Sequence, residues 1–437
     1  MKKKITLTVV LIIIILSVIT HFAFFGRPNS TVFDEVHFGK FVSGYLNHKY
    51  FFDIHPPLGK LAIAGVAKLT GFKTGFDFKV IGEKYPDRSY LWLRLLPVLA
   101  GTLLPIVIFF LARELRLSLL ASFSASLLII FENALLGQSL FILLDSMLLL
   151  FGFLGLLLYL IYKRQKSIYI FILAVVSLSF ALSIKWTGAA LLGLVFIFEI
   201  FDLVKNKVQK RTVPKLIILV FLPLIIYFSV FALHFSILKN PGEGDAFMSK
   251  DFKTENVLQK FIELNREMYR ANGRIADNHP YSSKWYTWPM MARPIYYWNE
   301  GTAPSEAKIY LFGNPIIFWA SLLGVIILIL NTIFYLRFLR KIKTSLFIIL
   351  GFIINYLPFA LITRPMFLYH YLSALIFGIL ALCFSIDAIK NKRLKVIIFI
   401  LIVTLAIASF FFFAPLTYGL KMSASAFNLR LWTKNWQ

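Results

Sequence analysis

The stretch 31–60 combines acids, imidazoles and a cation directly after a long apolar segment. It holds two adjacent carboxylates, Asp34 and Glu35, and three histidines. A carboxylate that faces a cavity can act as a general base towards a hydroxyl nucleophile. His55 and Lys60 flank a Pro-Pro pair, and a cation and an imidazole near a helix start suit a phosphate. The pattern therefore indicates proton abstraction beside an anionic group.

Structural explanations exist for the same residues. Thr31-x-x-Asp34 approximates a capping box, and acids stabilise the first turn of a helix, so Asp34 is either a cap or a base. Pro56-Pro57 is typical of a turn that enters a helix. Adjacent residues on a helix diverge by about 100°, so Asp34 and Glu35 are expected to have separate roles.

The composition is that of a membrane protein. The chain has 437 residues, of which 59% are hydrophobic and 15% charged, and its mean hydropathy is +0.77. Repeated apolar runs near the ~20 residues that cross a bilayer predict an all-α polytopic protein with about eleven transmembrane helices. The predicted spans are 5–25, 90–112, 117–135, 139–162, 167–184, 187–204, 214–236, 308–336, 344–363, 366–389 and 395–416.

The net charge of +25 reports topology rather than nucleic-acid binding, because the basic residues form short blocks at every second connection. The first apolar run lacks a small-residue cleavage site after it, so we expect a retained helix in the cell membrane with a cytoplasmic N-terminus. The C-terminus is then extracytoplasmic. The blocks are Lys2–Lys4, Arg113/Arg116, Lys163/Arg164/Lys166, Lys205–Lys215, Arg337–Lys343 and Lys390–Lys395.

Two long connections then fall on the extracytoplasmic face of one domain, 1–437. The first, 26–89, is expected to carry two short helices, and the second, 238–307, an amphipathic helix and an aromatic interfacial segment. Spans and a short outer tail follow in 308–437. The predicted helices are Asp34–Tyr45, Leu58–Leu69 and Asn256–Met268, and the aromatic segment is 279–298. The first of these helices is expected to pack through Phe38, Phe41, Val42 and Tyr45, which fall on one side of it.

Several ionisable side chains fall inside spans or at their outer edges, where charges are costly and usually pair or face a cavity. Arg94, Lys185 and Arg364 lie near outer ends, so they either snorkel to the interface or form a pocket for an anionic head group. Glu132 and Asp145 are interpreted as structural partners for these cations. No phosphate loop, dinucleotide fingerprint, zinc-ligand spacing or nucleophile elbow is present. The sequence therefore gives no sign of a fold that binds a nucleotide-sugar in the cytosol, and a sugar donor is expected to arrive through the membrane on a lipid phosphate.

Segments along nearly the whole chain resemble one family, the protein O-mannosyltransferases. The resemblance is carried by FDEVHFGKF (33–41) and FFDIHPPLGKL (51–61), which are similar to that family's first outer loop. Further matching segments follow in the family's order: RLLPVLAGTLLP (94–105), FENALLGQSLFILLDSMLL (131–149), SIKWTGA (183–189), HPYSSKWYTWPMMARPIYYW (279–298) and NYLPFALITRPMFLYHYLSAL (355–375).

The resemblance implies a GT-C membrane glycosyltransferase that transfers mannose, with inversion, from polyprenyl-phosphate mannose to Ser/Thr hydroxyls of exported proteins. Asp34 would be the general base, and Glu35 would shape the acceptor site. No cofactor or metal ligand is required by this scheme, although it leaves a divalent metal open. The residues expected at the donor phosphate and sugar are His55, Lys60, Arg94, Lys185, Arg364 and His370.

Two departures from the family pattern stand out. Leu140 occupies a position where the family commonly has arginine, and the second outer loop lacks the β-trefoil (MIR) insertion of eukaryotic members, which points to a bacterial or archaeal type. One alternative is a GT-C enzyme that glycosylates a lipid or glycan. Another is a transporter or lipid flippase, which would show paired inverted repeats. The sequence specifies neither the polyprenol length nor the oligomeric state.

Overall fold

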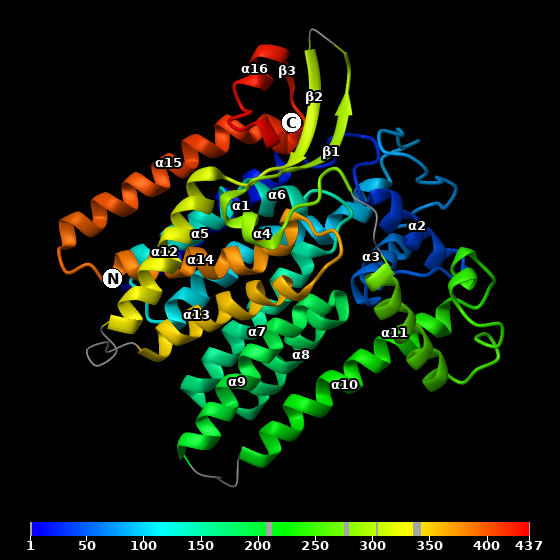
Figure 1. Cartoon of the computed structure of the whole chain (residues 1–437), viewed down its shortest axis with the longest axis horizontal. Coiled ribbons are helices and arrows are strands. Elements are labelled where there is room, and N and C mark those ends of the chain that lie inside the picture. The colour runs from blue at the N-terminus through cyan, green and yellow to red at the C-terminus, as the bar shows by residue number, and fades with distance from the viewer. Residues whose placement is uncertain (1, 207–211, 275–278, 303–304, 335–341, 437) are drawn as a thin grey trace. The chain divides into compact units, whose positions relative to one another are not determined.

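The computed structural model describes residues 2–206, 212–274, 279–302, 305–334 and 342–436 (Figure 1). The chain divides into two compact units. Unit 1 comprises Met1–Pro28, Val98–Phe141 and His279–Gln437, and unit 2 comprises Asn29–Pro97 and Ile142–Asn278. Helix α4 (Tyr90–Glu114) begins in unit 2 and ends in unit 1. Each unit is described separately below.

Unit 2 combines membrane helices with the two segments that flank them. Helices α7 and α8 pack along each other, and Gly155 permits their close approach, since a Cβ there would lie 2.5 Å from Leu178 Cγ. Helices α7 to α10 run side by side in Figure 1. The elements are α2 (Glu35–Leu46), α3 (Leu58–Leu69), α7 (Asp145–Gln165), α8 (Ile168–Ile184), η1 (Trp186–Gly188), α9 (Ala189–Asn206), α10 (Thr212–Ile237), η2 (Glu243–Phe247) and α11 (Val257–Arg274).

Unit 1 holds the remaining spans and a small antiparallel sheet of order β1-β2-β3, which the sequence did not predict. Strand β1 pairs with β2 from Ile295↔Leu311 onward, with a bulge at Tyr296/Trp298. The elements are α1 (Lys2–Phe22), α5 (Leu119–Ile130), α6 (Asn133–Ser139), η3 (Trp285–Met290), β1 (Ile295–Glu300), β2 (Ser305–Leu311), α12 (Pro315–Phe334), α13 (Ile342–Tyr356), η4 (Leu357–Leu361), η5 (Leu368–Tyr371), α14 (Leu372–Asp387), α15 (Lys392–Tyr418), β3 (Lys421–Ser423), α16 (Ala424–Asn428) and η6 (Lys434–Trp436).

The membrane character predicted from the sequence is confirmed. Over the described residues, nine helices are long and apolar enough to cross a bilayer, and α5 with α6 forms a tenth if that pair, bent by 58°, is one span. The predicted span 167–184 corresponds to the shorter apolar helix α8. Parts of the basic blocks Lys205–Lys215 and Arg337–Lys343 lie outside the described residues.

Three predicted span boundaries were wrong. The span 117–135 is interrupted after Ile130, where the chain bends before α6. The span 139–162 begins only at Asp145, and 308–336 begins only at Pro315. In the last case apolar residues that looked like a helix start instead belong to β2, because hydropathy alone does not separate a buried strand from a buried helix.

The short helices predicted outside the spans are confirmed. Helix α2 buries Phe38, Val42 and Tyr45, three of the four residues expected on its packed side. Helix α3 starts directly after Pro57, whose fixed φ is compatible with a first turn. Helix α11 is longer than predicted and ends at Arg274. Helices α2 and α3 carry or flank the predicted site residues Asp34, Glu35, His55 and Lys60.

Candidate functional site

Asp34 immediately precedes α2 and does not cap it. Its backbone lies at φ −68° and ψ −1°, and its side chain makes no capping hydrogen bond. The Thr31 hydroxyl donates instead to the carbonyl oxygen of Glu83, at 3.2 Å. The capping-box interpretation of Thr31-x-x-Asp34 was therefore wrong, and another carboxylate performs that task.

That carboxylate is Glu35, which is completely buried. Its Oε2 accepts a hydrogen bond from the backbone N–H of Val32 at 2.9 Å, and its Oε1 accepts one from the N–H of Ile142 at 2.9 Å. The Tyr85 hydroxyl donates to Oε2 at 3.0 Å. Glu35 thus fixes the start of α2 to two segments that are distant in sequence.

Arg94, also completely buried, completes this cluster with a bidentate ion pair. Its Nε lies 2.7 Å from Glu35 Oε1, and its Nη2 lies 2.7 Å from Glu35 Oε2. The rings of Tyr85 and Tyr90 lie against the guanidinium, with centroids 5.6 and 5.0 Å from Cζ. Arg94 therefore does not snorkel to the interface. Two buried charges that pair in this way fix their local geometry, because loss of either one leaves the other buried without a counter-charge.

The Asp34 carboxylate has a different environment, although it is adjacent in sequence. The side chain is partly exposed. Burial raises the pKa of Asp34 to about 7, against the opposing effect of the Lys185 ammonium. A carboxylate whose pKa lies near neutrality is well matched to accept a proton at physiological pH. Asp34 and Glu35 therefore lie in different environments, which supports the prediction that they have separate roles.

Lys185 is held by Asp145, as the sequence interpretation proposed for Asp145. The Lys185 Nζ lies 2.7 Å from Asp145 Oδ2. Lys185 follows α8 in an extended conformation, with φ −146° and ψ 146°. The tight turn after it depends on Gly188, where a Cβ would lie 2.4 Å from the carbonyl carbon of Ala181. Glu132, in contrast, forms no ion pair with any residue that the structure describes. It accepts hydrogen bonds from the N–H groups of Leu135 and Asn314, so its predicted pairing was wrong.

Lys60 is almost fully buried and forms an ion pair with Asp53, a residue that sequence reasoning missed. Its Nζ also donates to the carbonyl oxygen of His55 at 2.7 Å. Burial alone would raise the pKa of Asp53, but the nearby Lys60 and His55 hold it below its usual value. Asp53 lies inside the FFDIHPP segment, so its acidic character beside a histidine was the available signal.

A small pocket is lined by Asp53, His55, Lys60 and His234, among others. His234 projects from the last turn of α10, and its Nδ1 lies 2.7 Å from the Tyr45 hydroxyl oxygen. The pocket therefore brings residues of the FFDIHPPLGKL segment together with a histidine from a distant helix. Sequence reasoning gave no indication of His234.

Arg364 and His370 belong to unit 1, whereas Asp34 belongs to unit 2. The His370 ring stacks on Trp288, with centroids 5.8 Å apart and planes inclined by 12°. Its Nδ1 lies 2.9 Å from the carbonyl oxygen of Phe367. Arg364 is partly buried between η4 and η5, and burial lowers its pKa. The described part of the chain contains no cluster of three or more His, Cys, Asp or Glu side chains placed to hold a metal.

Comparison with known proteins gives two family matches. The model described as "Dolichyl-phosphate-mannose-protein mannosyltransferase" matches residues 11–239, slightly more than half of the chain. The model described as "C-terminal four TMM region of protein-O-mannosyltransferase" matches residues 257–436. The two matches follow each other along the chain and include every candidate site residue.

Individual proteins agree with these matches. Protein O-mannosyltransferase 1 of Drosophila melanogaster is 36% identical over 249 residues, which cover 54% of this chain and 28% of the relative. The chain spans about a third of the length of the curated relatives it matches. The structure of the Saccharomyces cerevisiae protein O-mannosyltransferase Pmt1–Pmt2 complex bound to the sugar donor aligns with a TM-score of 0.92 at 19% identity, covering 100% of this chain and 93% of that one. An oligosaccharyltransferase from Archaeoglobus fulgidus aligns with a TM-score of 0.60 at 12% identity, covering 95% and 56%. The fold is therefore the GT-C fold.

Proposed function

Since the chain belongs to the dolichyl-phosphate-mannose–protein mannosyltransferase family, we propose that it transfers mannose from a polyprenyl-phosphate mannose to Ser/Thr hydroxyls of proteins. The observation that carries this proposal is the contrast between two adjacent acids. Glu35 is buried and fully engaged by donors, whereas Asp34 is partly exposed, makes no capping hydrogen bond and has a pKa raised to about 7. Glu35 fixes the start of α2, and Asp34 is available to accept a proton.

In the proposed reaction Asp34 accepts the proton of an acceptor hydroxyl as its oxygen attacks the anomeric carbon of mannose. The bond from that carbon to the phosphate oxygen breaks, and polyprenyl phosphate leaves with the bonding pair. In-line attack inverts the anomeric configuration. The leaving phosphate carries its charge without protonation at neutral pH, so one carboxylate suffices.

The proposed roles of the cations differ according to their contacts. Lys185 contributes positive potential beside Asp34 and, with His55, is proposed to interact with the donor phosphate. Arg94 and Lys60 are proposed to act through the acids they hold, Glu35 and Asp53, because their charges are already paired inside the protein. From the sequence, Arg364 and His370 remain proposed donor ligands.

The cellular setting is part of the same proposal. The alternation of basic blocks favours a cytoplasmic N-terminus, and it supports an extracytoplasmic Asp34 in the cell membrane. The described residues between α10 and α12 form α11 and two strands, which supports the proposal that the chain lacks a β-trefoil insertion and is of a bacterial or archaeal type. We treat residues 1–437 as one GT-C membrane domain.

The proposal is tested by identifying the product. Membranes containing the chain are incubated with labelled polyprenyl-phosphate mannose and either a Ser/Thr-rich peptide or a lipid acceptor. The expected result is labelled peptide carrying mannose on a hydroxyl, with inverted anomeric configuration. Label found only on the lipid acceptor would support the alternative GT-C reaction, and a retained configuration would contradict single in-line attack.

A further inference from the structure

Helix α11 packs against the second half of α10, at the level where α8 ends. Its Asn265 Oδ1 accepts a hydrogen bond from the Tyr227 hydroxyl of α10 at 2.7 Å, and that hydroxyl accepts one from Trp186 Nε1 at 2.8 Å. Trp186 lies just past the end of α8. The buried residues Leu264 and Met268 of α11 pack against Phe231 of α10. The middle of α11 is therefore placed at the membrane surface, on the side where α8 and α10 end.

Next to this packed face, α11 exposes a stripe of apolar side chains. Leu258, Ile262 and Tyr269 are 56%, 39% and 75% exposed. At about 100° per residue they fall within roughly 40° of one another around the helix. Leu233 of α10 is also 50% exposed. Exposed apolar side chains on both helices are expected where a helix lies in the membrane interface.

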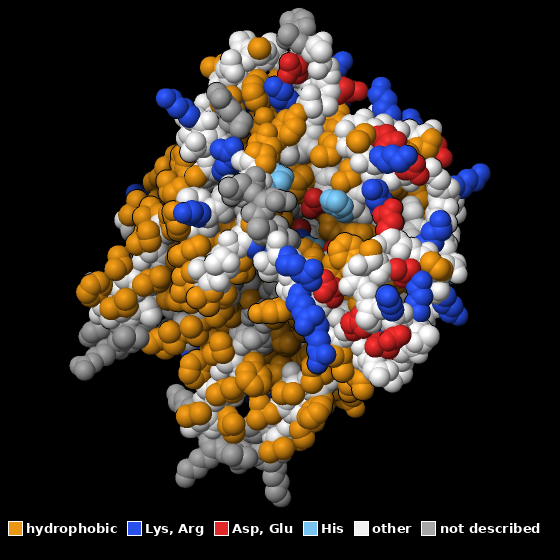
Figure 2. All heavy atoms as spheres, turned by 45° about the vertical axis from the view of Figure 1, so that its right-hand side comes forward, with side chains coloured by type: hydrophobic (Ala, Val, Ile, Leu, Met, Phe, Trp, Pro, Cys, Tyr) orange, Lys and Arg blue, Asp and Glu red, His pale blue; other side chains and the backbone are white. Residues whose placement is uncertain are grey.

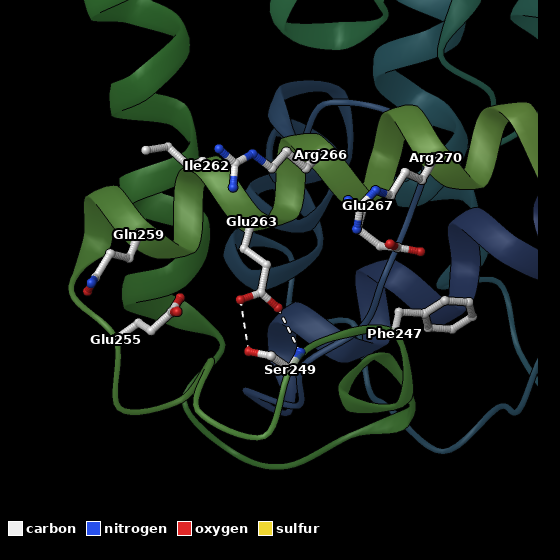
Figure 3. Close-up of a pocket in the computed structure, with 9 residues that line it drawn as sticks. All are labelled: Phe247, Ser249, Glu255, Gln259, Ile262, Glu263, Arg266, Glu267 and Arg270. Atoms are coloured by element: carbon white, nitrogen blue, oxygen red, sulfur yellow. Dashed lines mark hydrogen bonds between the residues drawn. The ribbon is translucent and has the colours of Figure 1, made fainter.

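Beyond the apolar stripe lies an arginine row formed by Arg266 and Arg270, one helical turn apart. Both line a groove of about 480 Å³ between α11 and the segment 247–255 (Figure 3). Both side chains are exposed, and no described residue forms a hydrogen bond or ion pair with either. Figure 2 shows basic and acidic side chains interspersed on one face, beside a hydrophobic surface.

Most of the acids in this groove are already occupied. Glu263 accepts hydrogen bonds from Ser249, at 2.7 Å from the backbone N–H and 2.9 Å from the hydroxyl (Figure 3). Glu267 is paired with Arg274 at 2.5 Å. Glu255 differs, because its Oε2 is buried and has no hydrogen-bond partner among the described residues. The groove therefore offers two guanidinium groups and one carboxylate to a ligand.

We propose that this groove binds the head group of a bilayer phospholipid. The arginine row would hold the phosphate, the apolar stripe would contact the acyl chains, and Glu255 would accept the ammonium of a zwitterionic head group. Guanidinium groups suit phosphate oxygens. An acceptor peptide accounts for this surface less well, because it would explain the arginines but not the exposed apolar stripe beside them.

The test measures binding of short-chain phosphatidylethanolamine to the purified full chain in detergent by native mass spectrometry. In the double variant Arg266→Gln/Arg270→Gln, the dissociation constant is expected to rise about tenfold or more. The matched control Lys239→Gln/Lys250→Gln removes the same charge from exposed lysines outside the groove and should change it less than about twofold. Equal weakening in both doubles would overturn the proposal.

Further probes separate the possible ligands. Inorganic phosphate should bind far more weakly than the lipid, since it lacks acyl chains, so equal affinity would refute lipid binding. A Ser/Thr-rich peptide that binds wild type but not the arginine double would assign the groove to acceptor protein instead. Wild type should prefer phosphatidylethanolamine to phosphatidylglycerol, and Glu255→Gln should abolish that preference; an unchanged preference would remove Glu255 from the site. Unchanged thermal unfolding shows that each variant is folded.

Discussion

Breaking the Glu35–Arg94 pair should lower the stability of the folded protein more than breaking an exposed ion pair does. In Glu35→Gln, the completely buried Arg94 guanidinium loses its counter-charge. Breaking a buried pair by removing one partner costs about 3–5 kcal/mol. A typical protein has only about 5–15 kcal/mol of total stability, so the loss is large. The melting temperature of the purified chain is expected to fall by roughly 5 °C or more.

The double variant Glu35→Gln/Arg94→Met separates charge from geometry. Replacing both charges of a buried pair with neutral groups is often close to neutral for stability, so the double should melt nearer to wild type than Glu35→Gln does. Mannose transfer by the double variant should nevertheless be lower than by wild type, because the start of α2, next to Asp34, would no longer be fixed.

Thermal unfolding in detergent, followed by circular dichroism, measures these effects. The control is Asp77→Asn, which breaks the exposed pair with Lys79 and should leave the melting temperature almost unchanged. The reasoning would be refuted if Glu35→Gln melted at the same temperature as Asp77→Asn, or if the double variant were less stable than Glu35→Gln.

Three further predictions follow from the same site. Lys185→Met removes a charge that lowers the pKa of Asp34, so the pH–rate profile should shift to higher pH; a shift to lower pH would contradict the assignment. Gly188→Ala would force a Cβ to within 2.4 Å of backbone and displace Lys185, so transfer should fall with little change in expression, whereas normal activity would show that the turn is not needed. Lys60→Met leaves the buried Asp53 carboxylate without its ammonium partner and should destabilise the folded protein by about 3 kcal/mol or more at pH 7. Burial then raises the pKa of Asp53 against His55 alone, so this loss of stability should diminish as pH falls, and a pH-independent loss would argue against it.

Sequence reasoning predicted the elements whose signal is local. Apolar runs gave the spans, and the helical spacing of Phe38, Val42 and Tyr45 gave α2. The Asp145–Lys185 pair could also be anticipated, because two opposite charges near the ends of neighbouring spans have few other ways to be satisfied.

The rest depended on contacts between residues far apart in the chain. The donors to Glu35 include Tyr85 and Ile142, 50 and 107 residues away, and no local pattern marks them. Glu132 looked like a partner for a cation, but the bend before α6 turns it into a helix cap that also accepts from Asn314. Strand β2 was concealed for a similar reason, since its pairing with β1 and β3 is not encoded in hydropathy.

The central claim is that Asp34 is the general base, and its pH–rate profile tests that most directly. Because the base must be deprotonated, kcat/KM for mannose transfer should rise with pH and reach half its maximum near pH 7. At pH 6 it should be about tenfold below that maximum. Asp34→Asn should reduce transfer by about 10²–10⁴-fold at equal folded protein, while Asp77→Asn leaves it unchanged. Wild-type rates with the same pH profile in Asp34→Asn would contradict the account.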